Sequence, residues 1–173
     1  LYARCRPTYP AAAIDHVIAT AGLHAGDLVV DVGAGTGISA RQFAARGLRV
    51  VGIEPNADMR AQAESAPPPP GILPEYRDGT AEATGIAPGS AQAVVSAQAF
   101  HWFRPEPTLR EFHRILAPGG WVALIWNERD DRDPFTAAVS AAMVMVCEAA
   151  SVEQPRRQAG TPLLTSPLFT EAQ

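Results

Sequence analysis

The sequence has no lysine, and its acidic residues outnumber its basic ones. All 14 basic residues are arginines, and with 18 acidic residues the formal net charge is −4. A chain of this charge has no overall positive field that would attract phosphate backbones. A nucleic-acid partner is therefore not expected.

Cysteines and long hydrophobic runs are also scarce. Cys5 and Cys147 are too few and too widely separated for a disulfide framework or a zinc cluster, which favours a reducing, cytoplasmic setting without a metal site. No run of about 18 apolar residues is free of proline, glycine or polar residues, and the first residues lack the apolar segment of a signal peptide. A membrane span is therefore not expected.

What the sequence does contain is typical of one folded domain. Of its 173 residues, 47% are hydrophobic and 18% are charged, which argues against disorder and against a fibrous repeat. At about 100 to 200 residues per domain, we expect a single domain over residues 1–173. Residues 154–173 show no periodicity, so we expect an irregular tail, and the abrupt end indicates a truncated sequence.

Short apolar runs alternate with helical patterns. Five runs predict strands, at residues 28–32, 50–53, around Tyr76, 93–97 and 121–126. Helices are predicted at about residues 10–22, 38–46, 56–65, 105–116 and 135–150. Such alternation implies right-handed crossovers and a mostly parallel sheet with helices on both faces. The expected fold class is α/β, a Rossmann-like doubly wound sheet.

The first predicted strand ends in an acidic residue and three alternating glycines. It reads Val-Val-Asp31-Val-Gly33-Ala-Gly35-Thr-Gly37. Glycine lets a backbone turn tightly and approach a ligand closely, because it has no Cβ. An ordinary turn needs only one glycine, so the run predicts a nucleoside-type site. A dinucleotide fingerprint needs its third glycine where Ile38 stands, which argues against a nicotinamide cofactor.

Glu54 ends the second predicted strand, about 20 residues after the glycine loop. A carboxylate at this place can accept hydrogen bonds from both hydroxyls of a ribose. The alternative is a solvated glutamate without a ligand. Its position after the glycine loop favours the sugar-binding role.

Four segments extend this pattern along the chain. They are Asp31-Val-Gly-Ala-Gly-Thr-Gly, Val-Gly-Ile-Glu54-Pro-Asn-Ala-Asp-Met59, Ala97-Gln-Ala-Phe-His101-Trp102-Phe and Leu116-Ala-Pro-Gly-Gly-Trp-Val-Ala-Leu-Ile-Trp-Asn127. In this order they resemble the class I S-adenosylmethionine-dependent methyltransferases, most closely the branch that includes trans-aconitate methyltransferase-like proteins. The similarity runs from residue 2 to about residue 134.

The resemblance implies S-adenosylmethionine as the cofactor. Asp31 would orient its ammonium group, and Glu54 would hold its ribose. Thr80 stands where many relatives carry an aspartate that meets the adenine. The implied cofactor-binding residues are Asp31, Gly33, Ala34, Gly35, Gly37, Glu54, Pro55, Met59, Thr80, Ala81, Glu82, Ser96 and Gln98.

His101 and Trp102 follow the fourth predicted strand and are the expected catalytic pair. The imidazole is either a general base or a hydrogen-bonded linker, and the indole N–H can serve a substrate acceptor. Plant and insect carboxyl methyltransferases, which the pair resembles, place a similar His-Trp beside the substrate carboxylate. Trp102 is therefore also an expected substrate-binding residue.

Three further residues are expected to bind the substrate. Arg6 and Tyr9 belong to an opening, residues 1–10, that is similar to an Arg-Pro-x-Tyr-Pro lid of this branch, with Arg6 as an anion clamp. The alternative is a frayed, solvated arm. Asn127 follows the fifth predicted strand and is expected at the rim of the pocket.

The resemblance implies methyl transfer to a small molecule, and we expect O-methylation of a small organic acid. Two alternatives stay open: an amine or hydroxyl acceptor with His101 as base, and a non-catalytic cofactor-binding module that acts through a partner. Relatives close their sheet with antiparallel strands that are missing here. If the protein ended at residue 173, the fifth strand would be an unprotected edge, so a trimmed sequence is the preferred explanation. The sequence predicts no oligomeric state.

Overall fold

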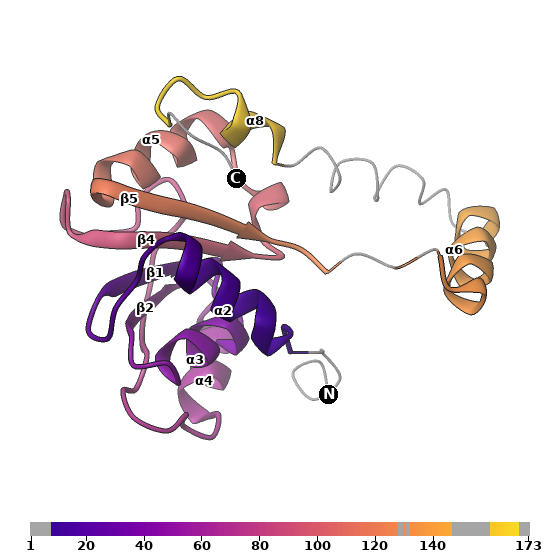
Figure 1. Cartoon of the computed structure of the whole chain (residues 1–173), viewed down its shortest axis with the longest axis horizontal. Coiled ribbons are helices and arrows are strands. Elements are labelled where there is room, and N and C mark those ends of the chain that lie inside the picture. The colour runs from indigo at the N-terminus through magenta and orange to yellow at the C-terminus, as the bar shows by residue number, and fades with distance from the viewer. Residues whose placement is uncertain (1–7, 128–129, 131, 147–159, 170–173) are drawn as a thin grey trace.

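The computed structural model describes residues 8–127, 130, 132–146 and 160–169. Its centre is a five-stranded sheet in the order β3-β2-β1-β4-β5 (Figure 1). The strands are β1 (Leu28–Val32), β2 (Arg49–Ile53), β3 (Glu75–Arg77), β4 (Ala91–Ala97) and β5 (Leu116–Ile125). Every neighbouring pair is parallel. The chain order reverses between β1 and β4, which is where doubly wound folds bind their ligands.

Helices connect β1 to β2, β2 to β3 and β4 to β5, as the alternation predicts, and others precede or follow the strands. The helices are α2 (Ala11–Thr20), α3 (Ile38–Ala44), α4 (Ala57–Ser65), the 3₁₀ turn η1 (Phe100–Trp102), α5 (Pro105–Ile115), α6 (Pro134–Val146) and α8 (Thr161–Leu164). The predicted doubly wound α/β fold is therefore confirmed. In the part of the chain that is described, no helix is long and apolar enough to cross a membrane.

One strand starts earlier than predicted. β5 begins at Leu116, directly after α5, instead of at residue 121. Leu116 pairs with Ala91, and a register shift between Ala91 and Ala93 accommodates the Pro-Gly-Gly that follows. The Pro-Gly-Gly sequence therefore forms an irregular first part of the strand.

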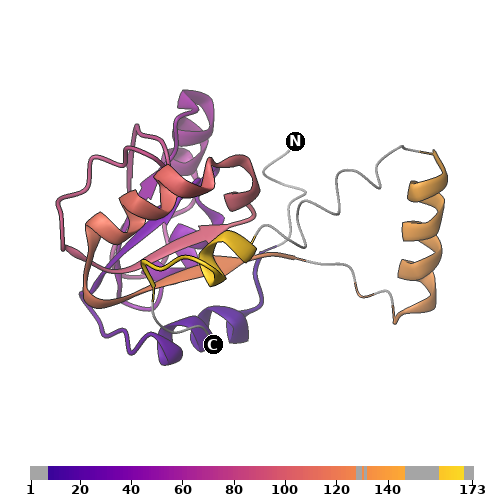
Figure 2. The ribbon, with the colours of Figure 1, turned by 90° about the horizontal axis from the view of Figure 1, so that it is seen from above.

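The sheet separates two apolar layers, because successive side chains of a strand point to opposite faces. Val30 and Val32 pack with the α5 side, in one cluster with Phe100 and Phe112. Val29 packs with the α2 and α3 side. Figure 2 shows α5 and α2 on opposite sides of the sheet.

The tail is more ordered than expected where it is described. The short helix α8 lies beside α5, and Leu163, Leu168 and Phe169 pack against the α5-side layer. The ring of His113 meets that of Phe169 edge-on, with centroids 6.1 Å apart. The expectation of an irregular tail was thus wrong for residues 161–164, where a proline at the start of a helix is favourable. Residues 154–159 and 170–173 lie outside the described residues.

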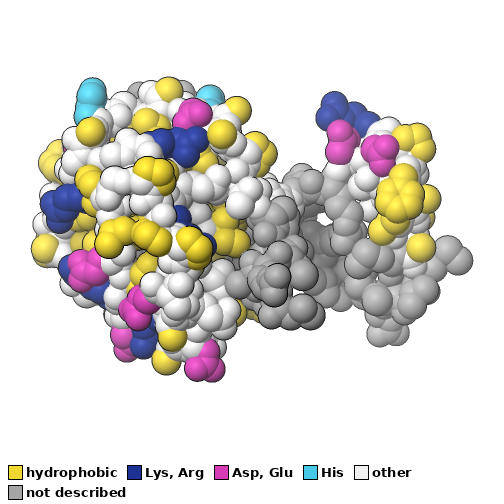
Figure 3. All heavy atoms as spheres, turned by 90° about the horizontal axis from the view of Figure 1, so that it is seen from below, with side chains coloured by type: hydrophobic (Ala, Val, Ile, Leu, Met, Phe, Trp, Pro, Cys, Tyr) yellow, Lys and Arg dark blue, Asp and Glu magenta, His cyan; other side chains and the backbone are white. Residues whose placement is uncertain are grey.

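Among the described residues, β5 is the last strand of the sheet and pairs with β4 alone. The helix α6 lies away from the sheet in both Figure 1 and Figure 2. Its Phe135 is largely exposed, and Figure 3 shows hydrophobic side chains at the surface of this part.

Candidate functional site

The glycine loop runs from the end of β1 to the start of α3. Gly33, Gly35 and Gly37 have φ angles of 74°, 56° and 75°, a left-handed conformation that side chains other than glycine rarely adopt. The backbone N–H groups of Gly33 and Ala34 donate to the carbonyl of Ile53, at 2.9 and 3.1 Å. The loop is therefore anchored to the carboxyl end of β2.

The three glycines face different surroundings. A Cβ on Gly33 would lie 2.5 Å from the Cβ of Ala99 and 3.0 Å from Cζ of Phe103. A Cβ on Gly37 would overlap the Tyr76 phenol, with Cζ at 2.7 Å. Two of the glycines therefore make room for the protein's own side chains, whereas all three were expected to serve the ligand.

Gly35 differs from its two neighbours. The nearest atom to a Cβ placed on it is Sδ of Met59, 4.0 Å away. This is the glycine beside which a ligand has space. Met59, an adaptable apolar side chain, lies at the edge of that space.

Asp31 occupies the end of β1 and is fully buried. Its Oδ2 accepts a hydrogen bond of 2.5 Å from Oγ of Ser39, in the first turn of α3. Burial raises the pKa of Asp31 to about 6, although the Ser39 hydroxyl and the Ala40 amide act to lower it. Oδ1 has no hydrogen-bond partner among the described residues. A cationic ligand group at Oδ1 would favour the ionised form.

Glu54 follows β2 and is 7% exposed. Its Oε2 accepts from the amide of Gly35 and its Oε1 from the amide of Asn56, each at 2.9 Å. Asn56 also caps α4, because its Oδ1 accepts from the amide of Met59 at 3.0 Å. The carboxylate is thus fixed beside Gly35, and each of its oxygens retains a lone pair for a ligand hydroxyl. Pro55 is exposed next to it.

The segment after β3 is attached to α5. Thr80 forms an isolated bridge with Ala83, and Ala81 is buried. Oε1 of Glu82 accepts from the backbone and side chain of Arg104, at 3.3 and 3.4 Å. Glu82 therefore holds the start of α5, and its carboxylate is already engaged there.

A second carboxylate, Glu111 of α5, holds the same segment and was missed from the sequence. Its Oε1 accepts from the backbone N–H of Thr84 at 2.8 Å and from its hydroxyl at 2.6 Å. Nε of Arg114 donates to Oε2 at 2.6 Å. Hydrogen bonding from Arg114 and Thr84 lowers the pKa of Glu111 to about 2. A buried glutamate on the apolar face of a helix is the signal that was available.

The end of β4 carries Ser96 and Gln98. Val95 pairs with Asp31, so the next residue, Ser96, faces the opposite side of the sheet. Gln98 has φ +59°, an uncommon conformation for a residue with a side chain. Its backbone N–H donates to Ile125 at 2.8 Å and its amide to the carbonyl of Asn127 at 3.4 Å. Gln98 and Asn127 therefore lie together at the ends of β4 and β5.

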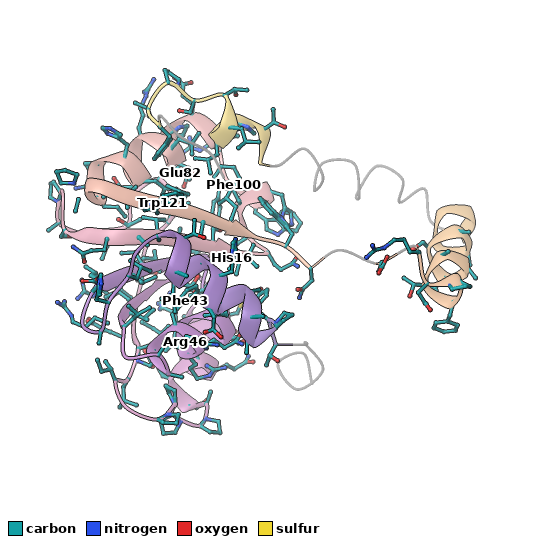
Figure 4. The ribbon with its side chains drawn as sticks, in the orientation of Figure 1. His16, Phe43, Arg46, Glu82, Phe100 and Trp121 are labelled. Carbon is teal, nitrogen blue, oxygen red and sulfur yellow. The ribbon has the colours of Figure 1, made fainter. Side chains whose placement is uncertain are left out.

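His101 and Trp102 lie in the turn η1 after β4. Their ring centroids are 4.9 Å apart and the planes are tilted by 43°. His101 is partly buried, whereas Trp102 is 77% exposed. Phe100, on the α5 side of the sheet in Figure 4, anchors the turn in the core, and Trp102 lies at the surface.

The expected lid is described only from residue 8 onward, so Arg6 lies outside the described residues. Tyr9 is buried in the same apolar layer as Phe43 of α3. Its backbone N–H and carbonyl bond to the side-chain amide of Gln42, at 3.2 and 2.7 Å. Tyr9 is therefore packed against α3 and is not part of a solvated arm.

Among the described residues, no three histidine, cysteine or acidic side chains are placed to hold a metal ion. The groups that converge at the carboxyl edge are instead one unsatisfied carboxylate oxygen of Asp31, the fixed carboxylate of Glu54 and the open space at Gly35. This arrangement suits a ligand with a cationic group and a pair of hydroxyls.

Known proteins are similar to this chain in sequence. Residues 30–124, more than half of the chain, match a family model described as a methyltransferase domain. An uncharacterised methyltransferase of Mycobacterium tuberculosis is 40% identical over 131 residues, which cover 76% of this chain and 51% of the relative. A methyltransferase-like protein of Schizosaccharomyces pombe is 30% identical over 80% of this chain and 53% of its own length. The chain spans about half the length of these relatives.

Solved structures agree. A proposed methyltransferase from an antibiotic biosynthesis pathway of Anabaena variabilis has a TM-score of 0.58 and 30% identity, covering 70% of this chain and 47% of that one. An S-adenosylmethionine-dependent methyltransferase candidate of Methanococcus maripaludis, at 16% identity, shares the fold with a TM-score of 0.66 over 88% of this chain and 74% of its own. The chain therefore belongs to the class I methyltransferase family, whose cofactor is S-adenosylmethionine.

Proposed function

We propose that the protein methylates a carboxylate of a small organic acid, as in the branch that includes trans-aconitate methyltransferase-like proteins. The observation that carries the proposal is the pair His101 and Trp102, presented after β4 with the Trp102 indole 77% exposed. Ligands of doubly wound folds bind at this edge of the sheet.

The described residues fit the cofactor. Oδ1 of Asp31 lacks a partner and suits the ammonium group, while Glu54 suits the ribose hydroxyls. Gly35 leaves space beside Glu54, bordered by Met59. When bound, S-adenosylmethionine supplies both the methyl group and the leaving group of an in-line displacement.

The residues of the chain align the acceptor and exclude water, with the reacting atoms about 3 Å apart. A carboxylate is already ionised at neutral pH and needs no base. Trp102 donates its indole N–H to the acceptor, and the neighbouring imidazole of His101 supports the indole. Arg6 is the proposed counter-charge of the acid and Asn127 borders the acceptor, while Tyr9, bonded to Gln42 of α3, anchors the segment that follows Arg6.

The test replaces Trp102 by phenylalanine, which keeps an aromatic ring and removes the donor. We expect kcat/KM for the acceptor to fall about tenfold or more, with unchanged affinity for S-adenosylhomocysteine. Acceptors are found by transfer of a radiolabelled methyl group to small acids, amines and phenols. A Trp102→Phe variant with unchanged kcat/KM would remove Trp102 from the acceptor site.

His101→Ala is the control that separates the alternatives. With a carboxylate acceptor, we expect a modest loss and a rate that is nearly flat from pH ~6 to ~8, because no proton must leave. A collapse of the rate, with an inflection near pH ~6.5 in the wild type, would indicate a hydroxyl or amine acceptor. Cofactor binding without transfer to any acceptor class would support the non-catalytic module.

A further inference from the structure

Tyr76 is a site residue that neither the glycine motif nor the acceptor turn contains. It sits on β3, directly opposite Gly52 of β2, and Gly52 is in turn opposite Asp31 of β1. Side chains in one row across a sheet point to the same face. Tyr76 and Asp31 therefore face α3, separated by a residue without a side chain.

The missing side chain of Gly52 lets the tyrosine ring lie across β2. A Cβ on Gly52 would stand 2.7 Å from Cδ1 and 2.9 Å from Cε1 of Tyr76. Real Cβ contacts are not this close, so the ring occupies the volume of the absent side chain. A glycine inside a strand marks such a close approach.

The ring reaches the glycine loop at Gly37. A Cβ on Gly37 would overlap the phenol oxygen and lie 2.7 Å from Cζ of Tyr76 and 2.8 Å from Nη1 of Arg41. That same Nη1 donates to the carbonyl of Thr36, within the loop, at 2.8 Å. The phenol oxygen is buried. The tyrosine thus fills the space beneath the last glycine of the loop, next to the arginine that holds the loop carbonyl.

We infer that Tyr76 is a positioning residue of the cofactor site, which acts through Gly37 and not by touching the cofactor. Gly37 caps α3, whose Ser39 donates to Asp31. Packing of the Tyr76 ring against Gly37 therefore fixes both the position of Gly35 and the Ser39 hydroxyl that orients the Asp31 carboxylate. This inference rests on the proposed cofactor site, and it gives Gly37 a different purpose from close approach to a ligand.

The two purposes of Gly37 predict different outcomes for a pair of substitutions. Gly37→Ala adds a methyl group that collides with Tyr76, and it also strains a left-handed backbone. In Gly37→Ala/Tyr76→Leu the collision with the ring is relieved, and the backbone strain and the close contact with the flexible Arg41 side chain remain. If the added methyl group met the cofactor instead, the second substitution would bring no relief.

The experiment measures the dissociation constant of S-adenosylhomocysteine by calorimetry and the melting temperature of each variant. We expect Tyr76→Leu to weaken binding about tenfold, Gly37→Ala to weaken it further, and the double variant to bind more tightly than Gly37→Ala. Gly35→Ala, which faces the open space beside Met59, should lose affinity that Tyr76→Leu does not restore. Phe112→Leu, buried on the other side of the sheet, is the matched control: it should lower the melting temperature and leave affinity unchanged.

A double variant that binds no better than Gly37→Ala would overturn the inference, as would unchanged affinity in Tyr76→Leu. If Tyr76→Leu does not fold, Tyr76→Phe takes its place, with an expected loss of about threefold, and unchanged affinity again overturns the inference. Wild-type protein that does not bind S-adenosylhomocysteine would overturn the cofactor site itself. An unchanged kcat/KM in the Trp102→Phe variant would instead contradict only the proposed acceptor site.

Discussion

At the scale of single residues, Asp31 is a charge in surroundings that compensate it only in part. It is fully buried, one oxygen accepts from Ser39, and the other has no partner among the described residues. Burial raises the pKa of its carboxyl group from 3.8 to about 6. The folded chain therefore favours neutral Asp31, and stability is lost as pH rises through about 6.

We predict that Asp31→Asn makes the cofactor-free protein more stable at pH ~8, by about 2 to 3 kcal/mol, because a shift of one pKa unit equals about 1.4 kcal/mol. The gain should shrink as pH falls from about 6 and vanish near pH ~2.5, below both pKa values, where the wild-type carboxyl group is neutral in both states. Urea unfolding at the two pH values measures it. Equal stability of both proteins at pH ~8 would show that the buried charge is compensated.

The same carboxyl group should make cofactor binding depend on pH. Its ionised form attracts the ammonium group, so the dissociation constant of S-adenosylhomocysteine should rise as pH falls below about 6, approaching tenfold per pH unit. Calorimetry from pH ~5 to ~7.5 tests this. In Asp31→Asn we expect weaker binding without this slope, and a slope that persists there would assign the titration to another group.

At the scale of elements, α5 holds the segment after β3 through Glu111. Hydrogen bonds from Arg114 and Thr84 lower the pKa of Glu111 from 4.5 to about 2. A lowered pKa means stability that is present above the unfolded value and lost as pH falls through the folded one. The contribution of Glu111 to the free energy of unfolding should therefore disappear as pH falls from about 4.5 to about 2.

We predict that Glu111→Gln destabilises the protein at neutral pH by about 1 to 3 kcal/mol, because the amide and hydroxyl of Thr84 lose a charged acceptor. Glu106→Gln is the matched control on the same helix. Glu106 pairs with Arg110 at the exposed surface, so its loss should change stability by less than about 0.5 kcal/mol. Equal effects of the two substitutions in denaturant unfolding would contradict the role of Glu111 in holding the segment after β3.

The elements also show what a sequence can predict. β1 matches its predicted range because an apolar, β-branched run is bounded there by a polar residue and a glycine. Tyr76 was read only as the centre of a weak strand, because its packing depends on Gly37 and Gly52, which a pattern of neighbours along the chain does not bring together. Glu111 was missed for the same reason, since its partner Thr84 lies in another segment.

At the scale of the whole molecule, the sheet separates two sets of polar groups. Asp31 faces α3, and Ser96, one residue beyond its pairing partner, faces α5. The expectation from the sequence placed both around one ligand without distinguishing the faces. Only the strand register, which depends on the assembled fold, separates them. The cofactor and substrate residues as a set remain predictions.

The contact of Gly33 with Ala99 and Phe103 bears on how such a site is transplanted. The loop packs closely against Ala99 and Phe103 at Gly33, and its far end packs against Tyr76 at Gly37. A designer who grafts the seven-residue motif into another α/β scaffold must therefore carry these three side chains with it. Sequence libraries that vary residue 103 should likewise keep glycine at position 33, because a Cβ there would lie 2.5 Å from Cβ of Ala99 whichever residue stands at 103.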